Sequence, residues 1–315
     1  MKHAWEIDVN VLLIFFVREE VFEKAFEAVR KVKPRRLLLW QDGPREGREN
    51  DWIGLERCRK IAENIDWDCE VYTHYCEKNY GCDPSTFYAQ KWAFSIVDKC
   101  IILEDDMVAE PTYFQYCKEL LDKYENDERI NHICGVNFFG NYEKCPNDYL
   151  FAISGTGAWA SWRRVADGWD ENYTFLDKEY YMKNLVTKER RALMKKIINV
   201  AWDRRRSGKA YWETILGFDA LLNNRLVIIP KKNMVTNIGL TENATHGSKP
   251  KLMTKQEKSL FYMTTTSQTF PLKHPEYVVM DQEYYKDWCK KLCVGHPFRK
   301  FYRKCVHVLK RIFYH

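Results

Sequence analysis

The sequence has no apolar run that is long enough to span a membrane. The longest, Val11–Val17, has seven residues, whereas a membrane-spanning helix needs about 20. Glu6 and Asp8 precede it, where a secretory signal would carry basic residues. These absences predict a cytoplasmic protein.

The sequence also lacks an organised cysteine pattern. Its 11 cysteines are an odd number in a chain of 315 residues, which excludes the disulfide framework of a small secreted domain. The pairs Cys76/Cys82 and Cys289/Cys293 do not have the C-x-x-C spacing of a structural zinc site. We therefore expect reduced thiols, as in cytoplasmic proteins.

No strong excess of one charge is present. The formal net charge is +6, from 50 basic and 44 acidic residues, and the acids are spread along the whole chain. This balance gives no reason to expect a nucleic-acid partner. A local basic excess occurs in residues 296–315, which contain no acid and repeat apolar residues at helical spacing. The pattern predicts a basic amphipathic helix, suited either to an anionic membrane surface or to docking on its own domain.

Strand-like and helix-like segments alternate through the first third of the chain. Apolar runs predict four strands, at Val9–Val17, Arg36–Trp40, Cys69–Thr73 and Cys100–Leu103. Helical periodicity predicts three intervening helices, at Glu19–Lys31, Leu55–Ile65 and Pro84–Val97. Such alternation implies α/β architecture with a mainly parallel sheet and helices on both faces.

The second half predicts more elements of both kinds but no internal repeat and no low-complexity linker. We expect a helix from Pro111, strands at His132–Phe138, Tyr149–Ser154 and Leu226–Ile229, a flexible segment at Gly155–Trp159, and helices within Asp177–Arg206 and Trp212–Asn223. This organisation favours one domain with a nucleotide-binding half (residues 1–130) and an acceptor half (131–250). Residues 251–315 form a C-terminal extension.

An acidic triplet, Glu104-Asp105-Asp106, directly follows the fourth predicted strand. Adjacent carboxylates repel one another unless a cation neutralises them. A divalent metal with oxygen ligands does so and can also bridge a diphosphate. In open parallel sheets ligands bind at the carboxyl ends of strands, where Asp42 also lies. The simpler alternative is a solvated acidic loop.

The stretch Ile101-Ile102-Leu103-Glu104-Asp105-Asp106-Met107, followed by Pro111-x-x-Phe114-x-Tyr116, resembles the DxD-type motif of GT-A (Rossmann-like) glycosyltransferases. The resemblance is closest to the alpha-1,3-mannosyl-glycoprotein N-acetylglucosaminyltransferase type and its bacterial relatives. It covers residues 9–120 well and 150–250 loosely.

The resemblance implies a role for several residues. Asp106 would bind Mn²⁺ or Mg²⁺, with Glu104 and Asp105 on the ribose and sugar side. The first strand, ending at Phe16 and Arg18, would meet the nucleotide. Asp42 would recognise uracil, and Lys91, on the helix that precedes the metal motif, would contact the nucleotide-sugar. His246, in Thr245-His246-Gly247, would be a second metal ligand; a lone His in a polar loop is otherwise usually just exposed.

An inverting transferase also needs a carboxylate base to take the proton of the acceptor hydroxyl. Asp219 and Glu213 are the two candidates. Alignment on the following Ile229-Pro230 strand favours Asp219, with Glu213 as the alternative; both can also be simply solvated.

The expected function is therefore metal-assisted inverting transfer of a hexosyl or N-acetylhexosaminyl group from a UDP-sugar. The acceptor would be a glycan, including a lipid-linked glycan of bacterial surface polysaccharide biosynthesis, and the tail would hold the enzyme as a peripheral membrane protein. The alternatives are a sugar-nucleotide nucleotidyltransferase and a non-catalytic nucleotide-sugar-binding protein. A nucleotidyltransferase normally has a glycine-rich basic loop after the first strand, whereas this chain has Val17-Arg18-Glu19-Glu20.

Overall fold

The computed structural model describes residues 3–188, 190–240, 253 and 258–291. His246 and the predicted helix at 296–315 lie outside these residues. Within them, no helix is both long and apolar enough to cross a membrane. The described residues form a mixed α/β fold with a large, mainly parallel sheet, as the sequence predicts.

The elements alternate along the chain. The strands are β1 (Ile7–Phe15), β2 (Pro34–Gln41), β3 (Glu70–Tyr75), β4 (Lys99–Glu104), β5 (Met107–Ala109), β6 (Ile130–Cys134), β7 (Tyr149–Ala152), β8 (Trp159–Trp162), β9 (Leu226–Pro230) and β10 (Val235–Asn237). The helices are α1 (Glu19–Arg30), α2 (Asn50–Ala62), α3 (Cys82–Ile96), α4 (Thr112–Lys123), α5 (Arg163–Ala166), α6 (Glu179–Leu185), α7 (Arg191–Ser207), α8 (Trp212–Leu222) and α10 (Gln282–Lys291), with a 3-10 turn, η1 (Thr174–Asp177).

Eight of the described strands form one sheet in the order β3-β2-β1-β4-β8-β6-β9-β7. All are parallel except β8 and β7, which run antiparallel to their neighbours. The sequence pattern predicts a flexible segment at Gly155–Trp159 and no strand after it, so it misses β8. The strand begins at Trp159, and its four side chains are fully buried between β4 and β6.

The centre of the sheet is built from continuous apolar strands. Val11, Leu12 and Leu13 of β1 have no exposed surface, as expected for a parallel strand covered on both faces. The helix α1 buries one face. Its buried residues include Phe22, Ala25, Phe26 and Val29, which form the apolar stripe that the sequence predicts.

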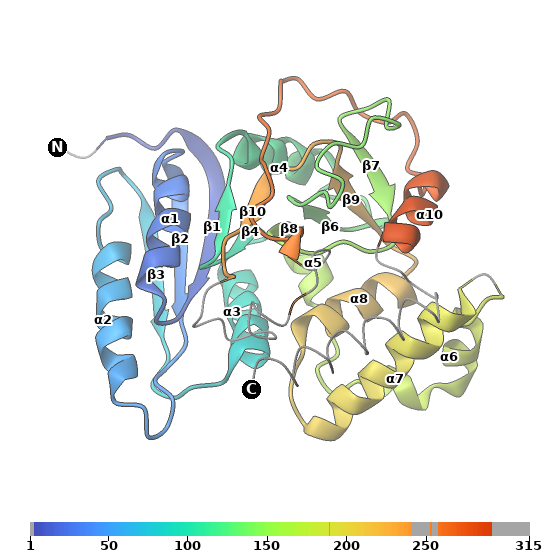
Figure 1. The fold of residues 1–315 in the computed structure, drawn as a ribbon, viewed down its shortest axis with the longest axis horizontal. Coiled ribbons are helices and arrows are strands. Elements are labelled where there is room, and N and C mark those ends of the chain that lie inside the picture. The colour runs from blue at the N-terminus through green and yellow to red at the C-terminus, as the bar shows by residue number, and fades with distance from the viewer. Residues whose placement is uncertain (1–2, 189, 241–252, 254–257, 292–315) are drawn as a thin grey trace.

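The order of the strands reverses between β1 and β4. The chain moves outward from β1 through β2 to β3, then returns to place β4 on the other side of β1. Right-handed connections therefore put α1 and α2 on one face and α3 on the other. A crevice opens at the carboxyl ends of the strands at such a reversal, where ligands bind. Figure 1 shows the β1–β3 half at the left and α6, α7 and α8 at the lower right.

A second, smaller sheet lies at the end of β4. β5 follows the acidic triplet directly and pairs antiparallel with β10, with Met107 opposite Asn237. The backbone N–H of Ile238 also donates to the carbonyl of Asp106, over 2.9 Å. The chain after β9 thus returns to the triplet.

The described part of the C-terminal extension packs back on the main sheet. Met280 bridges to Phe151 of β7, and α10 lies beside β7 (Figure 1). Tyr142 donates a hydrogen bond to Asp287 of α10, and Lys144 forms ion pairs with Asp287 and Glu283. The division into residues 1–130, 131–250 and 251–315 remains a prediction.

Candidate functional site

A pocket of about 930 Å³ opens at the carboxyl ends of β1, β2 and β4. This volume is within the range of small-molecule sites. The pocket wall includes Phe16 and Arg18 after β1, Asp42 after β2, Glu104 and Asp105 at the end of β4, and Lys209 and Tyr211 before α8. The strand reversal therefore coincides with the cavity, and three of the predicted regions meet there.

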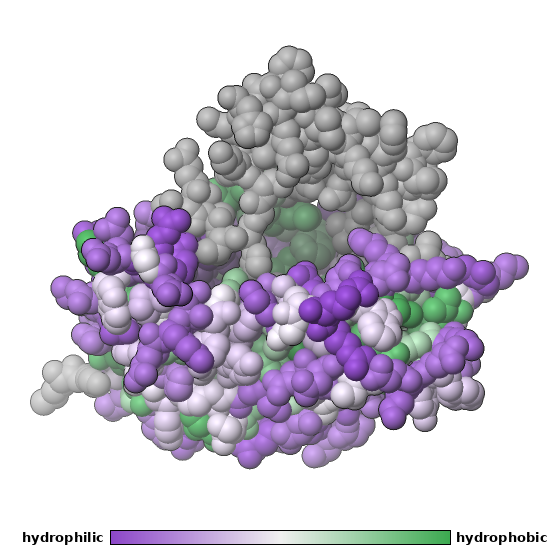
Figure 2. Space-filling model, turned by 90° about the horizontal axis from the view of Figure 1, so that it is seen from below, coloured by the Kyte–Doolittle hydropathy of each residue, from purple (hydrophilic) through white to green (hydrophobic). Residues whose placement is uncertain are grey.

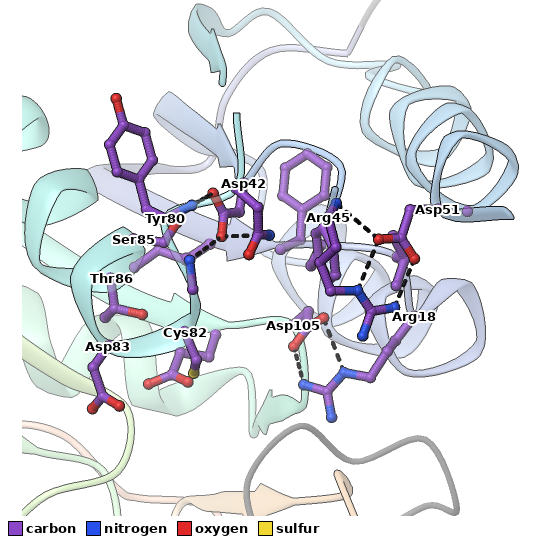
Figure 3. Close-up of a pocket in the computed structure, with 18 of the residues that line it drawn as sticks. Arg18, Asp42, Arg45, Asp51, Tyr80, Cys82, Asp83, Ser85, Thr86 and Asp105 are labelled. Carbon is purple, nitrogen blue, oxygen red and sulfur yellow. Dashed lines mark hydrogen bonds and ion pairs between the residues drawn. The ribbon is translucent and has the colours of Figure 1, made fainter. Parts of the chain in front are cut away.

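Arg18 pairs with the acidic triplet. Its guanidinium contacts both carboxylate oxygens of Asp105 and donates to Asp106 over 2.9 Å. Figure 3 shows the Arg18 side chain turned toward Asp105. The pairing brings the ends of β1 and β4 together, as the predicted roles of these residues require.

The triplet carries more acid than its described neighbours neutralise. Burial raises the pKa of Glu104 well above its usual value, and the charges of Asp106, Glu213 and Asp105 raise it further. Burial also raises the pKa of Asp105, to about 6, although Arg18 opposes this shift. Four carboxyl groups thus influence one another, and Arg18 is the cation that pairs with them among the described residues, so the local potential favours an added cation.

Glu213 lies close enough to the triplet for its charge to raise the pKa of Glu104, and the direction of α8 explains this proximity. This helix precedes the parallel strand β9, so its first turn lies at the carboxyl edge of the sheet and its last turn at the amino edge. Trp212 stacks on Trp159, the first residue of β8, with ring centroids 4.1 Å apart. The stack fixes the first turn of α8 at the site, and the adjacent Glu213 is exposed to solvent there.

The structure places Asp219 elsewhere. It is buried two turns along α8, where its carboxylate accepts hydrogen bonds from Asn131 and Asn223 and pairs with Arg225 at 3.0 Å. Asn131 and Arg225 lie at the starts of β6 and β9, which is the opposite edge of the sheet from the triplet. The preference for Asp219 as the base is therefore not supported by its position, and Glu213 is the better candidate.

Asp42 lies in the pocket wall, but its carboxylate is already engaged. It accepts from the backbone N–H groups of Gly43, Tyr80 and Gly81 and from the side chain of Asn79, at 2.9 to 3.0 Å. Figure 3 shows the Asp42 carboxylate beside Tyr80, with dashed lines to its neighbours in the pocket wall. Burial raises its pKa in spite of them. Four bonds occupy the usual acceptor positions of a carboxylate, so Asp42 organises the loop and leaves little capacity for recognising a base.

Of two other predicted site residues, Phe16 lines the pocket and Lys91 does not. The ring of Phe16 lines the pocket and faces the guanidinium of Arg45, 5.4 Å from its centroid, while Arg45 pairs with Asp51. Lys91 donates to the carbonyl of Ala166 over 3.1 Å and ties α3 to α5, away from the pocket wall. Its predicted contact with the nucleotide is therefore not supported.

Three site residues had no signal in the sequence. The side chain of Asn237 donates to Asp106 over 3.4 Å. A Cβ on Gly239 would overlap the Asp106 carboxylate, so a larger residue there would force that carboxylate or the backbone to move. Tyr173 holds the part of the pocket wall formed by Lys209 and Tyr211, since its hydroxyl accepts from the N–H of Tyr211 and donates to the carbonyl of Lys209. All three contacts join segments distant in sequence, which periodicity does not reveal.

The donor set suits a hard divalent cation, since it consists of carboxylate oxygens. Among the described residues, however, no group of three or more His, Cys, Asp or Glu side chains has the arrangement of a metal site. Mg²⁺-type sites often use one or two carboxylates and take their other ligands from phosphates and water. The triplet fits that kind of site, with Glu104 and Asp106, which are more exposed than the buried Asp105, as its carboxylates.

No protein-family model matches the chain, and no curated protein matches it. The similar solved structures include three nucleotide-related proteins. The inositol-1-phosphate CTP transferase from T. maritima is 10% identical, with 78% of this chain and 94% of that chain covered and a TM-score of 0.37. A UDP-glucose pyrophosphorylase complexed with UDP-glucose is 8% identical, with 73% and 93% covered and a TM-score of 0.34. HddC from Yersinia pseudotuberculosis is 9% identical, with 51% and 80% covered and a TM-score of 0.31. Scores below 0.5 at such identities give no argument about the reaction of this chain.

Proposed function

We propose that the protein is a glycosyltransferase that moves a sugar from a UDP-sugar to an acceptor hydroxyl with inversion. The observation that carries the proposal is the approach of Glu213 to the acidic triplet beside the pocket. An exposed carboxylate next to a cation-attracting cluster is the arrangement that direct displacement requires.

In this mechanism the oxygen of the acceptor hydroxyl attacks C1 of the donor sugar, and the bond from C1 to the diphosphate oxygen breaks. Glu213 takes the proton of the hydroxyl as the new glycosidic bond forms. A divalent cation at the triplet would supply charge stabilisation for the departing diphosphate. Arg18 and Lys209 add positive charge on two walls of the pocket.

The nucleoside would bind beside the loop that Asp42 organises. Asn79 and Tyr80 of this loop line the pocket together with Phe16. The loop is held by the hydrogen bonds to the Asp42 carboxylate, so its exposed atoms are fixed before the ligand arrives. Such preorganisation reduces the entropy lost on binding.

Nucleotidyl transfer is the second candidate. Arg45, Arg48 and Arg57 line the pocket in addition to Arg18 and Lys209, and so many cations suit a triphosphate. Against this, Glu19 and Glu20 occupy the first turn of α1 and also line the pocket. Acids at a helix N-terminus compete with phosphate for the same backbone N–H groups.

The decisive experiment is incubation of the full chain with Mn²⁺ and a panel of UDP-sugars, with release of UDP as the readout. We expect release with at least one donor. Glu213→Gln should lower the rate by about 10²- to 10⁴-fold, the usual contribution of a general base. Asp106→Ala should abolish the release of UDP.

Asp219→Asn is the matched control, because it alters a carboxylate of the same helix at the opposite edge of the sheet. Rates are compared per folded molecule, as measured by circular dichroism. An unchanged rate in Glu213→Gln, or an equal loss in Asp219→Asn, would show that the base is wrongly assigned. Pyrophosphate release from a nucleoside triphosphate and a sugar 1-phosphate, without UDP release from any donor, would favour nucleotidyl transfer instead.

A further inference from the structure

The positive charge of the chain is concentrated around α6 and α7. Residues 178–209 contain eleven Lys or Arg and three Asp or Glu, a net charge of +8, whereas the whole chain carries +6. Some of these cations are neutralised locally, since Lys183 pairs with Glu179 and Arg205 with Asp177. Arg191, Lys195 and Lys196 are exposed and have no ion pair with the described residues.

Two tyrosines lie exposed on α6, at the start of this segment. The side chains of Tyr180 and Tyr181 are 73% and 60% exposed, with ring centroids 5.4 Å apart. Both rings therefore leave a large aromatic area in water. Tyrosine, with an apolar ring and a polar tip, is enriched where proteins meet the membrane–water interface.

The helix α7 is also incompletely covered. Of its described side chains, only Met194 and Ala201 are buried. Leu193 and Val200 are partly exposed between the cations, and Ile197, Ile198 and Trp202 are partly exposed while they also pack against the core. Figure 2 views the molecule from the side on which α6 and α7 lie, and shows green apolar residues scattered among purple hydrophilic ones. Mixed cationic and aliphatic surface is typical of interfacial helices.

This surface leads directly into the pocket wall. The chain leaves α7 at Gly208, and the next residues, Lys209 and Tyr211, line the pocket. The guanidinium of Arg204, in the last turn of α7, stacks on the ring of Tyr211 with 3.5 Å between the guanidinium carbon and the ring centroid. A partner bound on α6 and α7 would therefore lie beside the opening of the site.

We propose that the α6–α7 surface docks on an anionic lipid bilayer. Three features support a bilayer: unpaired cations for anionic headgroups, exposed tyrosines for the interface, and aliphatic side chains for the acyl boundary. Single-stranded nucleic acid would use the cations and aromatic rings but not the aliphatic side chains. The proposal does not depend on the sugar chemistry, and it would place the pocket next to a membrane-bound acceptor.

The test is vesicle flotation of the full chain, without donor, on neutral phosphatidylcholine and on phosphatidylcholine containing phosphatidylglycerol. Arg191→Gln/Lys195→Gln/Lys196→Gln should weaken binding to the anionic vesicles by at least about 10-fold, because each basic residue near an anionic surface contributes to binding. Tyr180→Ser/Tyr181→Ser should also weaken binding to the anionic vesicles. Added salt given to the unaltered chain should not reproduce this loss. Urea unfolding verifies that each variant is folded.

The matched control is Lys24→Gln/Lys31→Gln/Lys60→Gln, which removes three exposed cations near α1 and α2. It should bind the vesicles like the unaltered chain. Equal binding by both triple variants, or no preference for anionic vesicles, would overturn the proposal. The proposal would also be overturned if the unaltered chain bound single-stranded RNA but no vesicles, and if the α7 variant lost the RNA binding. UDP release measured without vesicles should be unchanged in the α7 variant, which separates this proposal from the proposed function.

Discussion

At the scale of single residues, a buried chain of polar groups begins at Asp219. Asn131 donates to Asp219 over 2.7 Å, and its side-chain oxygen faces Nδ1 of His132 at 2.7 Å. Nε2 of His132 faces the carbonyl of Gly155 at 2.8 Å. Burial lowers the pKa of His132 to about 4, against 6.5 in a model compound. The imidazole is therefore neutral at pH 7.

This shift predicts a loss of stability in mild acid. The folded pKa lies below the unfolded pKa, so the unfolded chain binds the proton first as the pH falls below about 6.5, and folding is progressively disfavoured down to about pH 4. Between pH 7 and pH 4.5 this residue should cost roughly 2 kcal/mol of unfolding free energy. Urea unfolding at both pH values checks it: the loss should be smaller by that amount in His132→Gln. An identical loss in both proteins would contradict the assignment.

Gly239 makes a second residue-scale prediction. Because a Cβ there would overlap Asp106, Gly239→Ala should displace either the triplet or the chain after β10. We expect UDP release to fall by at least about 10-fold, since small misplacements at a site can cost up to about 10²-fold. Michaelis–Menten measurements on the folded variant test this. A wild-type rate would show that Asp106 has no fixed position in the reaction.

At the scale of elements, the sequence predicts the alternating first half well and the second half less well. Continuous apolar strands and one-sided helices are local signals, and β1, α1, β2, α3 and β4 follow from them. The strand β8 has only four residues after a glycine-rich stretch, so its identity depends on pairing with β4 and β6. The alignment on the Ile229-Pro230 strand favours Asp219 over Glu213, but it does not assign the two ends of α8 to the two edges of the sheet.

The helix α8 also contains a glycine that its fold does not require. Gly217 lies in the helix interior without a positive φ, and a Cβ there would meet no heavy atom within 4 Å. Gly217→Ala should therefore stabilise the protein by about 0.5 to 1 kcal/mol, mainly by restricting the unfolded chain. Thermal unfolding should shift upward by roughly 1 °C. UDP release should not change; a lower melting temperature would mean that the helix backbone is constrained in another way.

At the scale of the whole molecule, the C-terminal segment is part of the folded body. Tyr284 of α10 is 2% exposed and packs on Tyr142 and Phe139, with ring centroids 5.0 and 5.5 Å away. Sequence periodicity does not reveal this packing, because the partners of α10 lie about 140 residues earlier in the chain.

Removing this contact should destabilise the whole protein. Tyr284→Ala leaves a cavity the size of an aromatic ring, and we expect a loss of about 3 kcal/mol. Lys286→Ala, an exposed neighbour on α10, should change stability by no more than about 0.5 kcal/mol. Urea unfolding of both variants measures the difference. Equal stabilities would indicate that α10 is attached only weakly.

The two edge strands of the large sheet, β3 and β7, differ in what lies beyond them. β7 carries the bridge to Met280 on its outer side, whereas β3 has no strand beyond it among the described residues, and Val71 and Tyr72 are 40% and 39% exposed. An unpaired edge is a template for adding another strand. With one edge open and the other covered, two copies joined at β3 would leave no further edge to extend. Strand-mediated self-association would then end at a closed pair and would not propagate into a fibre.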